Sequence, residues 1–506
     1  MLRDTLKMNN IIEIFLKNVE KNPSKIAVIL KDKTYTYKQL QLDIEEYSYF
    51  FESSGLTKNT HTLLILENSY EFIVSMLAIA NIGAVIAPLS TTLKKDAILK
   101  AISTTQSTYL ITNSKIKNKL NIDAVSTLCI DTIKPNHESY KLNMNKIDIS
   151  QDYILTLTSG STGDPKPIVF TQETKINRSL LAARDLYNLD SSERIIVASP
   201  LYHSMGQRLI LLPLLIGATC VLLPKFSPKL WIETVQKHKI TFTIAIASHL
   251  NILVQTLKPQ DDMSSLHTIV SSSSLLEDDI KAQCIEKFGC DFHECYGASE
   301  VGIVTNLAPI DCKSNLSSVG KALPFVDIKI VNDKKEVLGV NKIGEIIVRS
   351  KTAFSRYFNN KEITKQNVID GYFYTADLGM IDERGFLYLK GRKKDVIIVG
   401  GTNVYPLDIE NEILKVPHIK ECCVIPIKDQ YFGEVIMAVI VPSDEQFDLK
   451  EVKKACIRNL AEYQQPMCYE ITKDLPKNDL GKIMKYKLIE QYKDYDVTKY
   501  LRGILT

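Results

Sequence analysis

Short apolar runs alternate with longer amphipathic stretches along most of this chain, up to about residue 390. Apolar and β-branched runs bounded by turn residues indicate buried strands, and stretches with a 3.6-residue period indicate helices. Because strands that alternate with helices favour parallel pairing, we expect parallel sheets covered by helices. The strands expected in this region are 61–66, 85–88, 108–112, 194–198, 219–223, 241–245 and 268–270.

Farther along, the pattern predicts a smaller β unit and then a separate module. Strands are expected at 328–331, 344–348, 396–399, 421–427 and 435–441, and helices at 408–414 and 449–460. No repeat or low-complexity linker intervenes, so we expect a short hinge near 392–395. The predicted class is α/β. It has a large N-terminal domain of helix-covered sheets plus a small β unit (1–391), and a small, mobile α+β C-terminal domain (392–506).

Two long apolar segments, 72–89 and 209–223, require a choice between core and membrane. A membrane-spanning helix needs about 20 uninterrupted apolar residues. Gly83 and Pro88 interrupt the first segment, and Pro213 and Gly217 interrupt the second. We therefore expect a buried helix that leads into a strand, and no integral membrane segment. The polar N-terminus also lacks the apolar centre of a secretory signal.

Charge and cysteine content narrow the class of protein further. The chain has 62 Lys and Arg against 59 Asp and Glu, a net charge of +3, so no strong field points to nucleic acid. Its ten cysteines form no C-x-x-C pair and no cluster with zinc-ligand spacing. Reduced cysteines in a cytoplasmic protein are the expectation.

A glycine- and hydroxyl-rich segment directly follows the apolar run 153–157. Residues 158–166 read Thr-Ser-Gly-Ser-Thr-Gly-Asp-Pro-Lys. Glycine lets backbone N–H groups approach an anion, hydroxyls add donors and lysine adds positive charge. The segment lacks the common nucleotide-loop pattern G-x-x-x-x-G-K-[ST]. It predicts phosphate binding by Thr158, Ser159, Gly160, Ser161, Thr162, Gly163 and Lys166.

The residue order of this loop resembles the phosphate-binding loop of the adenylate-forming superfamily. That superfamily comprises acyl- and aryl-CoA synthetases, peptide-synthetase adenylation domains and firefly-type luciferases. Four further motifs follow in the superfamily's order, the last ending at Lys482, and the segment 82–89 is also similar to a family core segment. The resemblance implies ATP and Mg²⁺ as cofactors and a carboxylic acid as substrate.

The second motif, 294–300, reads Glu-Cys-Tyr-Gly-Ala-Ser-Glu at the end of a strand expected at 291–294. It is similar to the family's Tyr-Gly-x-Thr-Glu. The resemblance implies that Tyr296 lies against adenine with Gly297 beside it, that Ser299 contacts the α-phosphate and that Glu300 holds Mg²⁺. Ser299 replaces the usual threonine but keeps the hydroxyl. A carboxylate oxygen is the kind of ligand that suits this hard cation.

The third motif combines Thr375-Ala376-Asp377-Leu378-Gly379 with Gly391-Arg392-Lys393-Lys394-Asp395. In the family, the equivalent aspartate binds the ribose, and a carboxylate can accept both hydrogen bonds of a vicinal diol. Asp377 is therefore the expected ribose anchor and Arg392 its partner near the nucleotide. Ala376 departs from the family's glycine, and Lys394 occupies the family's hinge position.

Two motifs in the C-terminal module complete the series. The segment 400–410 resembles the part of CoA ligases that forms a pantetheine tunnel, which implicates Gly400 and Gly401 in thiol access. The segment 475–483 matches the family's Pro-x-x-x-x-Gly-Lys and places Lys482 as the lysine that catalyses adenylation. A lysine can bridge an attacking carboxylate and the α-phosphate as charge develops.

The acid pocket distinguishes members of the superfamily. Amino-acid-activating domains usually carry an aromatic residue followed by Asp, whereas this chain has His203 and Ser204. An α-ammonium would then be buried without a counter-charge, which is costly. His203 matches acyl- and aryl-CoA ligases and is expected to act with Lys482 in catalysis. Serines replace family glycines in 271–274, which favours a small aromatic or polar acid. The predicted pocket residues are His203, Ser204, Ser272, Ser273 and Gly302.

Three functions remain open at this point. The first is a carboxylate–CoA ligase, and the second is a stand-alone adenylating enzyme that loads the phosphopantetheine of a separate carrier protein. The third is a luciferase-like or non-catalytic member. No carrier-like segment follows Lys482 in this sequence, so we expect the thiol to come from CoA or from a separate carrier protein.

Overall fold

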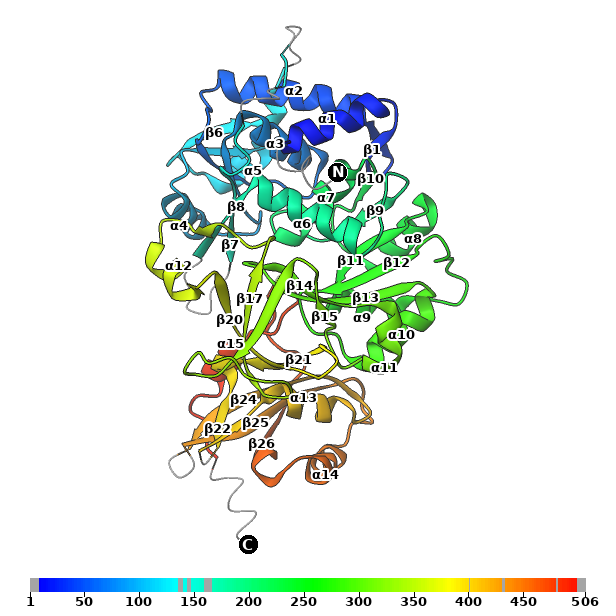
Figure 1. Ribbon diagram of the computed structural model, residues 1–506, viewed down its shortest axis with the longest axis vertical. Helices are drawn as coiled ribbons and strands as arrows, with labels where there is room; N and C mark the ends of the chain where they lie inside the picture. The colour runs from blue at the N-terminus through cyan, green and yellow to red at the C-terminus, as the bar shows by residue number, and fades with distance from the viewer. Residues whose placement is uncertain are drawn as a thin grey trace. The chain divides into compact units, whose positions relative to one another are not determined.

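The computed structural model describes residues 9–134, 140–142, 147–158, 166–399, 401–429, 433–478 and 481–497. The chain divides into two compact units (Figure 1). The first comprises Met1–Ser314, Leu323–Asp327 and Arg349–Phe373, and the second comprises Asn315–Ala322, Ile328–Val348 and Tyr374–Thr506. The structure has the α/β class that the sequence predicts.

Two helix-covered sheets build the first unit. In spatial order, one contains β14 (Gly302–Leu307), β13 (Asp291–Ala298), β12 (Thr268–Ser272), β11 (Phe242–Ile246), β9 (Arg194–Val197), β10 (Thr219–Leu222), β1 (Ile26–Leu30) and β2 (Lys33–Thr36). The other contains β18 (Arg356–Tyr357), β8 (Lys166–Thr171), β7 (Asp152–Thr158), β4 (Val85–Pro88), β3 (His61–Leu64), β5 (Tyr109–Thr112) and β6 (Ser126–Cys129).

Both sheets are mixed, whereas the sequence pattern predicted parallel pairing. Their interiors are parallel, as in β9–β11–β12–β13 and β4–β3–β5. Strand β18 pairs antiparallel with β8, and strands that are close in sequence also pair antiparallel in β1–β2, β7–β8 and β13–β14. These hairpins have no room for a crossover helix, which parallel pairing requires. Two of them carry predicted nucleotide-binding motifs.

Helices cover the sheets because their apolar faces need burial. Those of the first unit are α1 (Ile11–Lys21), α2 (Tyr37–Ser53), α3 (Tyr70–Ile82), α4 (Lys95–Thr105), α5 (Ser114–Leu120), α6 (Gln172–Asp185), α7 (Ser204–Ile216), α8 (Pro228–His238), α9 (Ala247–Thr256), α10 (Asp278–Phe288) and α12 (Lys361–Asn367). Helix α3 is buried along its whole length, begins at the N-cap Ser69 and ends at Gly83 in the left-handed region, before β4. The prediction of a buried helix leading into a strand at 72–89 is confirmed.

Strands β16 (Val326–Val331), β17 (Gly344–Ser350), β20 (Tyr372–Ile381), β19 (Val368–Ile369) and β21 (Leu387–Arg392) form the small β sheet. The C-terminal sheet contains β23 (Thr402–Val404), β22 (Ile397–Val399), β25 (Gly433–Pro442), β24 (Ile419–Asp429) and β26 (Cys468–Ile471). Its helices are α13 (Pro406–Leu414), α14 (Leu449–Asn459) and α15 (Lys485–Gln491).

The C-terminal sheet is buried on both faces, and successive side chains of β24 belong alternately to two core clusters. Cys422 and Val424 belong to the core cluster that contains residues of α13 and α14, and Cys423 and Ile425 belong to the cluster that contains Leu488 of α15. Successive side chains of a strand point to opposite faces. The adjacent cysteines therefore lie in different cores, and all ten cysteines of the chain are free thiols.

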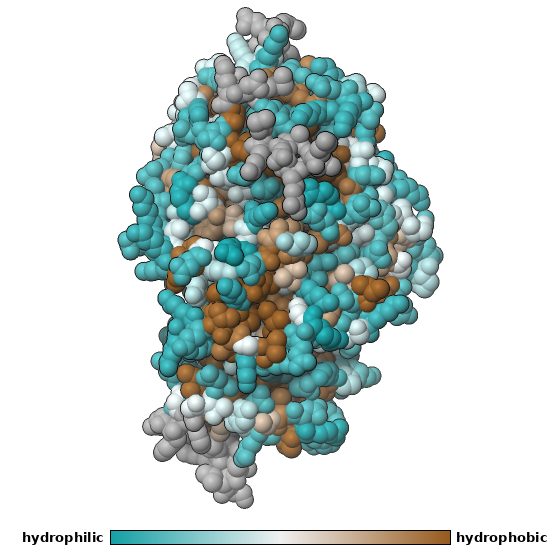
Figure 2. Space-filling model, in the orientation of Figure 1, coloured by the Kyte–Doolittle hydropathy of each residue, from teal (hydrophilic) through white to brown (hydrophobic). Residues whose placement is uncertain are grey.

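Figure 2 shows a mainly hydrophilic face interrupted by apolar patches, as is ordinary for globular proteins. In the part of the chain that the structure describes, no helix is both long enough and apolar enough to cross a bilayer.

Candidate functional site

Strands β7 and β8 bracket the predicted phosphate loop. They form a hairpin in which Thr158, the last residue of β7, is the Cα partner of Lys166, the first residue of β8. Ser159, Gly160, Ser161, Thr162 and Gly163 lie outside the described residues. The loop therefore follows the carboxyl end of β7, the edge at which open α/β sheets bind ligands.

The second motif covers the carboxyl end of β13 and the start of the turn to β14, and the close approach of these strands requires glycine at position 297. A Cβ placed on Gly297 would lie 2.1 Å from the carbonyl oxygen of Gly302, closer than atoms can approach. Tyr296 beside it is only 8% exposed. Ser299 and Glu300 follow in the turn and are half-buried.

Two residues that the sequence did not single out hold Glu300. The hydroxyl of Tyr357, on β18, donates a hydrogen bond of 2.9 Å to Glu300 Oε1. Burial raises the pKa of Tyr357, and the negative charge of Glu300 raises it further, so the phenol stays protonated. Arg178 of α6 donates through Nη2 to the carbonyl oxygens of Ser299 and Glu300, at 2.9 and 3.1 Å.

The predicted acid pocket begins at the amino end of α7. His203 is the N-cap residue of this helix, its ring lies 4.3 Å from that of Tyr202, and Ser204 is the first helical residue. A Cβ on Gly206 would lie 2.2 Å from the carbonyl oxygen of Pro200, so a glycine is needed for this tight entry. Arg178 Nη1 lies 3.4 Å from Ser204 Oγ. The same arginine therefore contacts both the Glu300 turn and the acid pocket.

The serines that replace family glycines lie at the carboxyl end of β12. Ser272 is the last residue of the strand, and Ser273 follows in the left-handed region with φ of 80°. This region favours glycine, because a Cβ crowds the backbone there. Gly302, the remaining predicted pocket residue, also has a positive φ of 79°.

The second unit brings together three predicted residues. Arg392 Nε lies 2.7 Å from Asp377 Oδ1, and the two residues are Cα partners in β20 and β21. Ala376 adopts φ of 57°, so the chain takes the left-handed turn of the family without its glycine. Asp377 is 8% exposed. A buried carboxylate beside a guanidinium is thus in place.

Lys482 lies close enough to Asp377 and Arg392 for their charges to shift its pKa. Lys482 is exposed, yet crowding by neighbouring protein atoms removes part of its surrounding water. This partial loss of water and the positive charge of Arg392 lower the pKa of Lys482, while the carboxylates of Asp377 and Asp395 oppose the shift. The backbone N–H of Lys482 donates to Asn478 Oδ1 at 3.0 Å, which fixes the turn around it. The ribose and catalytic motifs are therefore neighbours within one unit, although 105 residues (482 − 377) separate them in sequence.

The remaining predicted residues of the C-terminal module lie near strand ends. Lys394 is an exposed residue of the short 3₁₀ turn Lys393–Asp395 that follows β21. Gly401, with φ of 85°, precedes β23, and a Cβ there would meet no atom within 4 Å. Gly400 lies outside the described residues.

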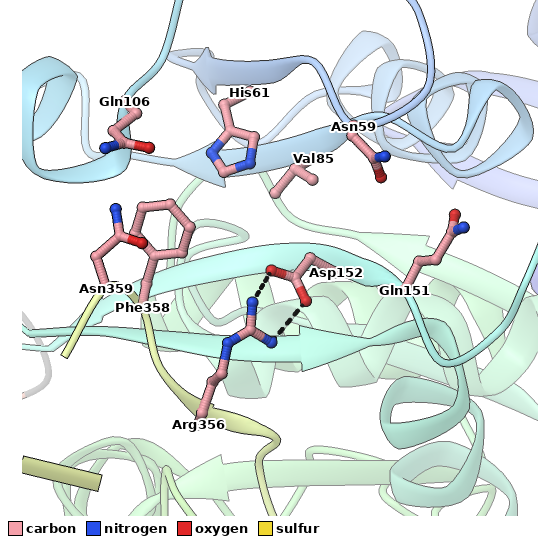
Figure 3. Close-up of a pocket in the computed structure, with 9 residues that line it drawn as sticks. All are labelled: Asn59, His61, Val85, Gln106, Gln151, Asp152, Arg356, Phe358 and Asn359. Carbon is pink, nitrogen blue, oxygen red and sulfur yellow. Dashed lines mark hydrogen bonds and ion pairs between the residues drawn. The ribbon is translucent and has the colours of Figure 1, made fainter. Parts of the chain in front are cut away.

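A cleft of about 370 Å³ in the first unit lies at a different edge (Figure 3). His61, Val85 and Asp152, which stand at the amino ends of β3, β4 and β7, help to line it. Asp152 and Arg356 face each other there in a two-bond ion pair of 2.6 and 2.9 Å. The predicted phosphate loop follows the opposite end of β7, so this cleft is separate from the predicted site.

Comparison with known proteins identifies the family. A family model described as AMP-binding enzyme matches residues 15–358, and the corresponding C-terminal domain model matches residues 408–482. This chain belongs to the AMP-binding enzyme family. The membership confirms the superfamily, the fold class and the AMP-forming ligase predicted from the motifs.

Similar proteins of this family act on different acids. A long-chain-fatty-acid–CoA ligase of Bacillus subtilis is 28% identical over 93% of this chain and 92% of its own length. An indoleacetate–CoA ligase of Aromatoleum aromaticum is 27% identical over 92% and 94%. The ATP-bound structure of MatB from Rhodopseudomonas palustris has a TM-score of 0.86 at 26% identity, over 96% of this chain and 99% of that one. An o-succinylbenzoate–CoA synthetase structure from Bacillus subtilis contains ATP and a magnesium ion, with a TM-score of 0.86 at 26% identity and 94% and 98% coverage.

We expect Gly297→Ala to destabilise the protein by about 1–3 kcal/mol, because the added methyl group overlaps the backbone of Gly302. Denaturant unfolding of the purified variant measures this. Gly339→Ala is the matched control, since a Cβ at Gly339 meets nothing within 4 Å. Equal unfolding free energies for the two variants would contradict the close approach at Gly297.

Proposed function

We propose that this protein converts a carboxylic acid into its acyl-CoA thioester in two steps. The acid attacks the α-phosphate of ATP and releases pyrophosphate, and the thiol of CoA then displaces AMP from the acyl-adenylate. The observation that supports the proposal is that Asp377 and Arg392, an ion pair, lie near enough to Lys482 to shift its pKa, so the proposed ribose carboxylate and the proposed adenylation lysine are neighbours. The relatives named as CoA ligases favour CoA as the thiol over a carrier protein.

The first unit supplies groups that fit ATP and Mg²⁺. In this proposal the loop residues Thr158 to Gly163 and Lys166 bind the phosphates, Tyr296 and Gly297 lie against the adenine, and Ser299 contacts the α-phosphate. Gly297 leaves its backbone open because no side chain fits there. Glu300 would hold Mg²⁺, and Tyr357 keeps its carboxylate oriented. Magnesium in such sites takes one or two carboxylates plus phosphate oxygens, and it neutralises the phosphates that separate.

Lys482 would act as the adenylation lysine. An ammonium group between the attacking carboxylate and the α-phosphate stabilises the charge that develops between them. Asp377 and Arg392 would hold the ribose beside it. His203 would line the entry to the acid pocket, together with Ser204, Ser272, Ser273 and Gly302.

The acid pocket should exclude amino acids. Ser204 stands where amino-acid-activating domains carry an aspartate, and the buried guanidinium of Arg178 lies 3.4 Å from its hydroxyl. A substrate α-ammonium would therefore meet positive charge and no carboxylate partner from this helix end. We infer that the substrate carries no α-ammonium group.

The C-terminal module would serve the two half-reactions in two orientations. Lys482 is needed for the first, and Gly400 and Gly401 line the thiol tunnel for the second. The predicted hinge at Lys394 is flanked by ion pairs of Lys390 with Asp408 (2.9 Å) and of Lys393 with Asp333 (2.8 Å). The Lys393–Asp333 pair is exposed, and such pairs contribute only about 0–1 kcal/mol, whereas the Lys390–Asp408 pair is partly buried and would have to open if the hinge rotates.

Substrate-dependent ATP–pyrophosphate exchange should occur without CoA, and the products of the full reaction should be AMP and pyrophosphate. A library of carboxylic acids, with amino acids beside their deamino analogues, supplies the substrates. Acyl-CoA formed with CoA alone would select the CoA ligase, and dependence on a holo carrier protein would overturn that acceptor. Cleavage of ATP to ADP would refute the proposed chemistry.

Two carboxylate variants should have unequal effects. Asp377→Ala removes ribose binding that is equal in ground and transition states, so it should mainly raise the KM for ATP, by about 10-fold or more. Glu300→Ala disturbs Mg²⁺ at the reacting phosphate and should mainly lower kcat, by about 100-fold. Glu362→Ala, an exposed position on α12, is the control. The same pattern of kcat and KM changes in both variants would contradict these roles.

The half-reactions should also separate. Lys482→Ala should lose adenylation but retain thioester formation from supplied acyl-adenylate, and exposed Lys473→Ala should change neither. Lys394→Pro fixes φ and removes an N–H, so it should retain adenylation and lose most thioester formation. Equal loss of both half-reactions in both variants would rule out the two-orientation scheme.

A further inference from the structure

A small cavity in the first unit lies against the predicted acid pocket and carries positive charge. Its polar lining consists of Asn177, Arg178 and Thr352, with Arg208 of α7 completing the wall, and Ile303 and Phe325 are among its apolar lining residues. The cavity volume is about 10 Å³, room for one water-sized group.

The cavity adjoins two residues that the sequence assigned to the acid pocket. Arg178 lies 3.4 Å from Ser204 Oγ, and Arg208 stands one helical turn after Ser204 on the same face of α7. A Cβ on Gly302 would lie 2.6 Å from Thr352 Oγ1 and 3.4 Å from Arg178 Nε. Gly302 thus keeps the wall of the cavity clear.

Arg178 and Arg208 differ in the hydrogen-bond partners that the described residues provide for them. Arg178 is only 6% exposed, and three backbone carbonyl oxygens, of Ser299, Glu300 and Thr352, accept its hydrogen bonds. Arg208 is half-buried, and its Nε is fully buried without a hydrogen-bond partner among the described residues. An arginine has five donors in a fixed fork that matches a carboxylate.

No carboxylate of the described residues forms an ion pair with Arg208. Burial lowers its pKa, and the groups that oppose this shift are Tyr187 and Cys295, which are ordinarily neutral. The charge of Glu300 favours the cationic form of Arg178, but the proposed function commits that carboxylate to Mg²⁺. A buried cation without a counter-charge is unfavourable, so an anionic group from a ligand would be bound strongly here.

We propose that the acid substrate carries a second carboxylate, and that Arg208 is the specificity-determining residue that binds it, with Asn177 and Arg178 beside it. This inference rests on the proposed function and narrows its substrate class to dicarboxylic acids. The carboxylate that becomes the thioester would lie toward His203. The second carboxylate would lie at the border of the acid pocket, with one of its oxygens in the water-sized cavity between α6 and α7.

The test is pyrophosphate exchange with matched pairs of acids. Succinate, glutarate, adipate and phthalate are each compared with their half-amides, which keep the shape and lose one charge. For the wild-type protein we expect at least one diacid to exceed its half-amide in kcat/KM by about 10-fold or more. In Arg208→Gln that ratio should fall by about 10- to 100-fold, and Arg208→Lys should restore part of it. Arg184→Gln, an exposed arginine of α6, is the control and should leave the ratio unchanged.

The outcomes separate this inference from the function on which it rests. Exchange with monocarboxylic acids or half-amides, but with none of the diacids, would overturn the second carboxylate and leave the ligase intact. An Arg208→Gln variant that is folded by circular dichroism but keeps the wild-type ratio would overturn the role of Arg208. No exchange with any acid of either class would count against the proposed function itself, and with it this inference.

Discussion

The buried guanidinium of Arg178 is the interaction on which the first unit's site depends. Its donors reach the carbonyl oxygens of the turn that carries Glu300, the carbonyl of Thr352 and the hydroxyl of Ser204. Hydrogen bonds from a charged donor contribute more than neutral ones, and a buried charge tolerates no loss of partners. One side chain of α6 therefore links the turn of Glu300, the proposed metal carboxylate, to Ser204 of the proposed acid pocket.

The environment of Arg178 is unusual because Lys175 stands one turn before it. Both cations lie against the ring of Phe170, at 4.1 and 4.4 Å from its centroid. Lys175 is fully buried, donates to Gln207 Oε1 at 2.6 Å, and has a pKa held well below its usual value by burial and by the neighbouring arginines. The π-face of phenylalanine offers these cations a surface without introducing a carboxylate. Burial favours the neutral amine of Lys175, so the positive charge that persists here at neutral pH is that of Arg178, whose pKa is lowered only to about 9.

Local features of the site could be predicted from the sequence, and contacts across the fold could not. The strand before the phosphate loop, the turn at Gly297 and the Asp377–Arg392 pair all follow from short motifs with defined spacing. Tyr357 and Arg178 could not be found this way, because 57 and 122 residues separate them from Glu300 and nothing near them in sequence suggests a site. The sequence pattern did not predict the antiparallel pairs of the mixed sheets. The alternation of helices and strands indicates only parallel pairing, which holds in the interior of each sheet.

The departures from the family's glycines also have a physical explanation. Ser273 and Ala376 both adopt the left-handed backbone that glycine would adopt more easily, at about 1–2 kcal/mol each. The fold therefore keeps the turn geometry even where the side chain opposes it. Ser273 adopts this backbone directly after β12, and Ala376 adopts it inside β20.

The pairing of β8 with β18 connects the predicted phosphate loop to Glu300. Strand β8 begins at Lys166, directly after the phosphate loop in sequence, and its residues Ile168 and Val169 pair with Tyr357 and Arg356 of β18. Tyr357 in turn holds Glu300. A displacement of β8 would therefore move β18 through their backbone pairing. Through the hydrogen bond of Tyr357 it would also move Glu300, the proposed metal carboxylate. Thermodynamic linkage makes such a connection reciprocal, so the affinity for a phosphate and the affinity for the cation should rise together.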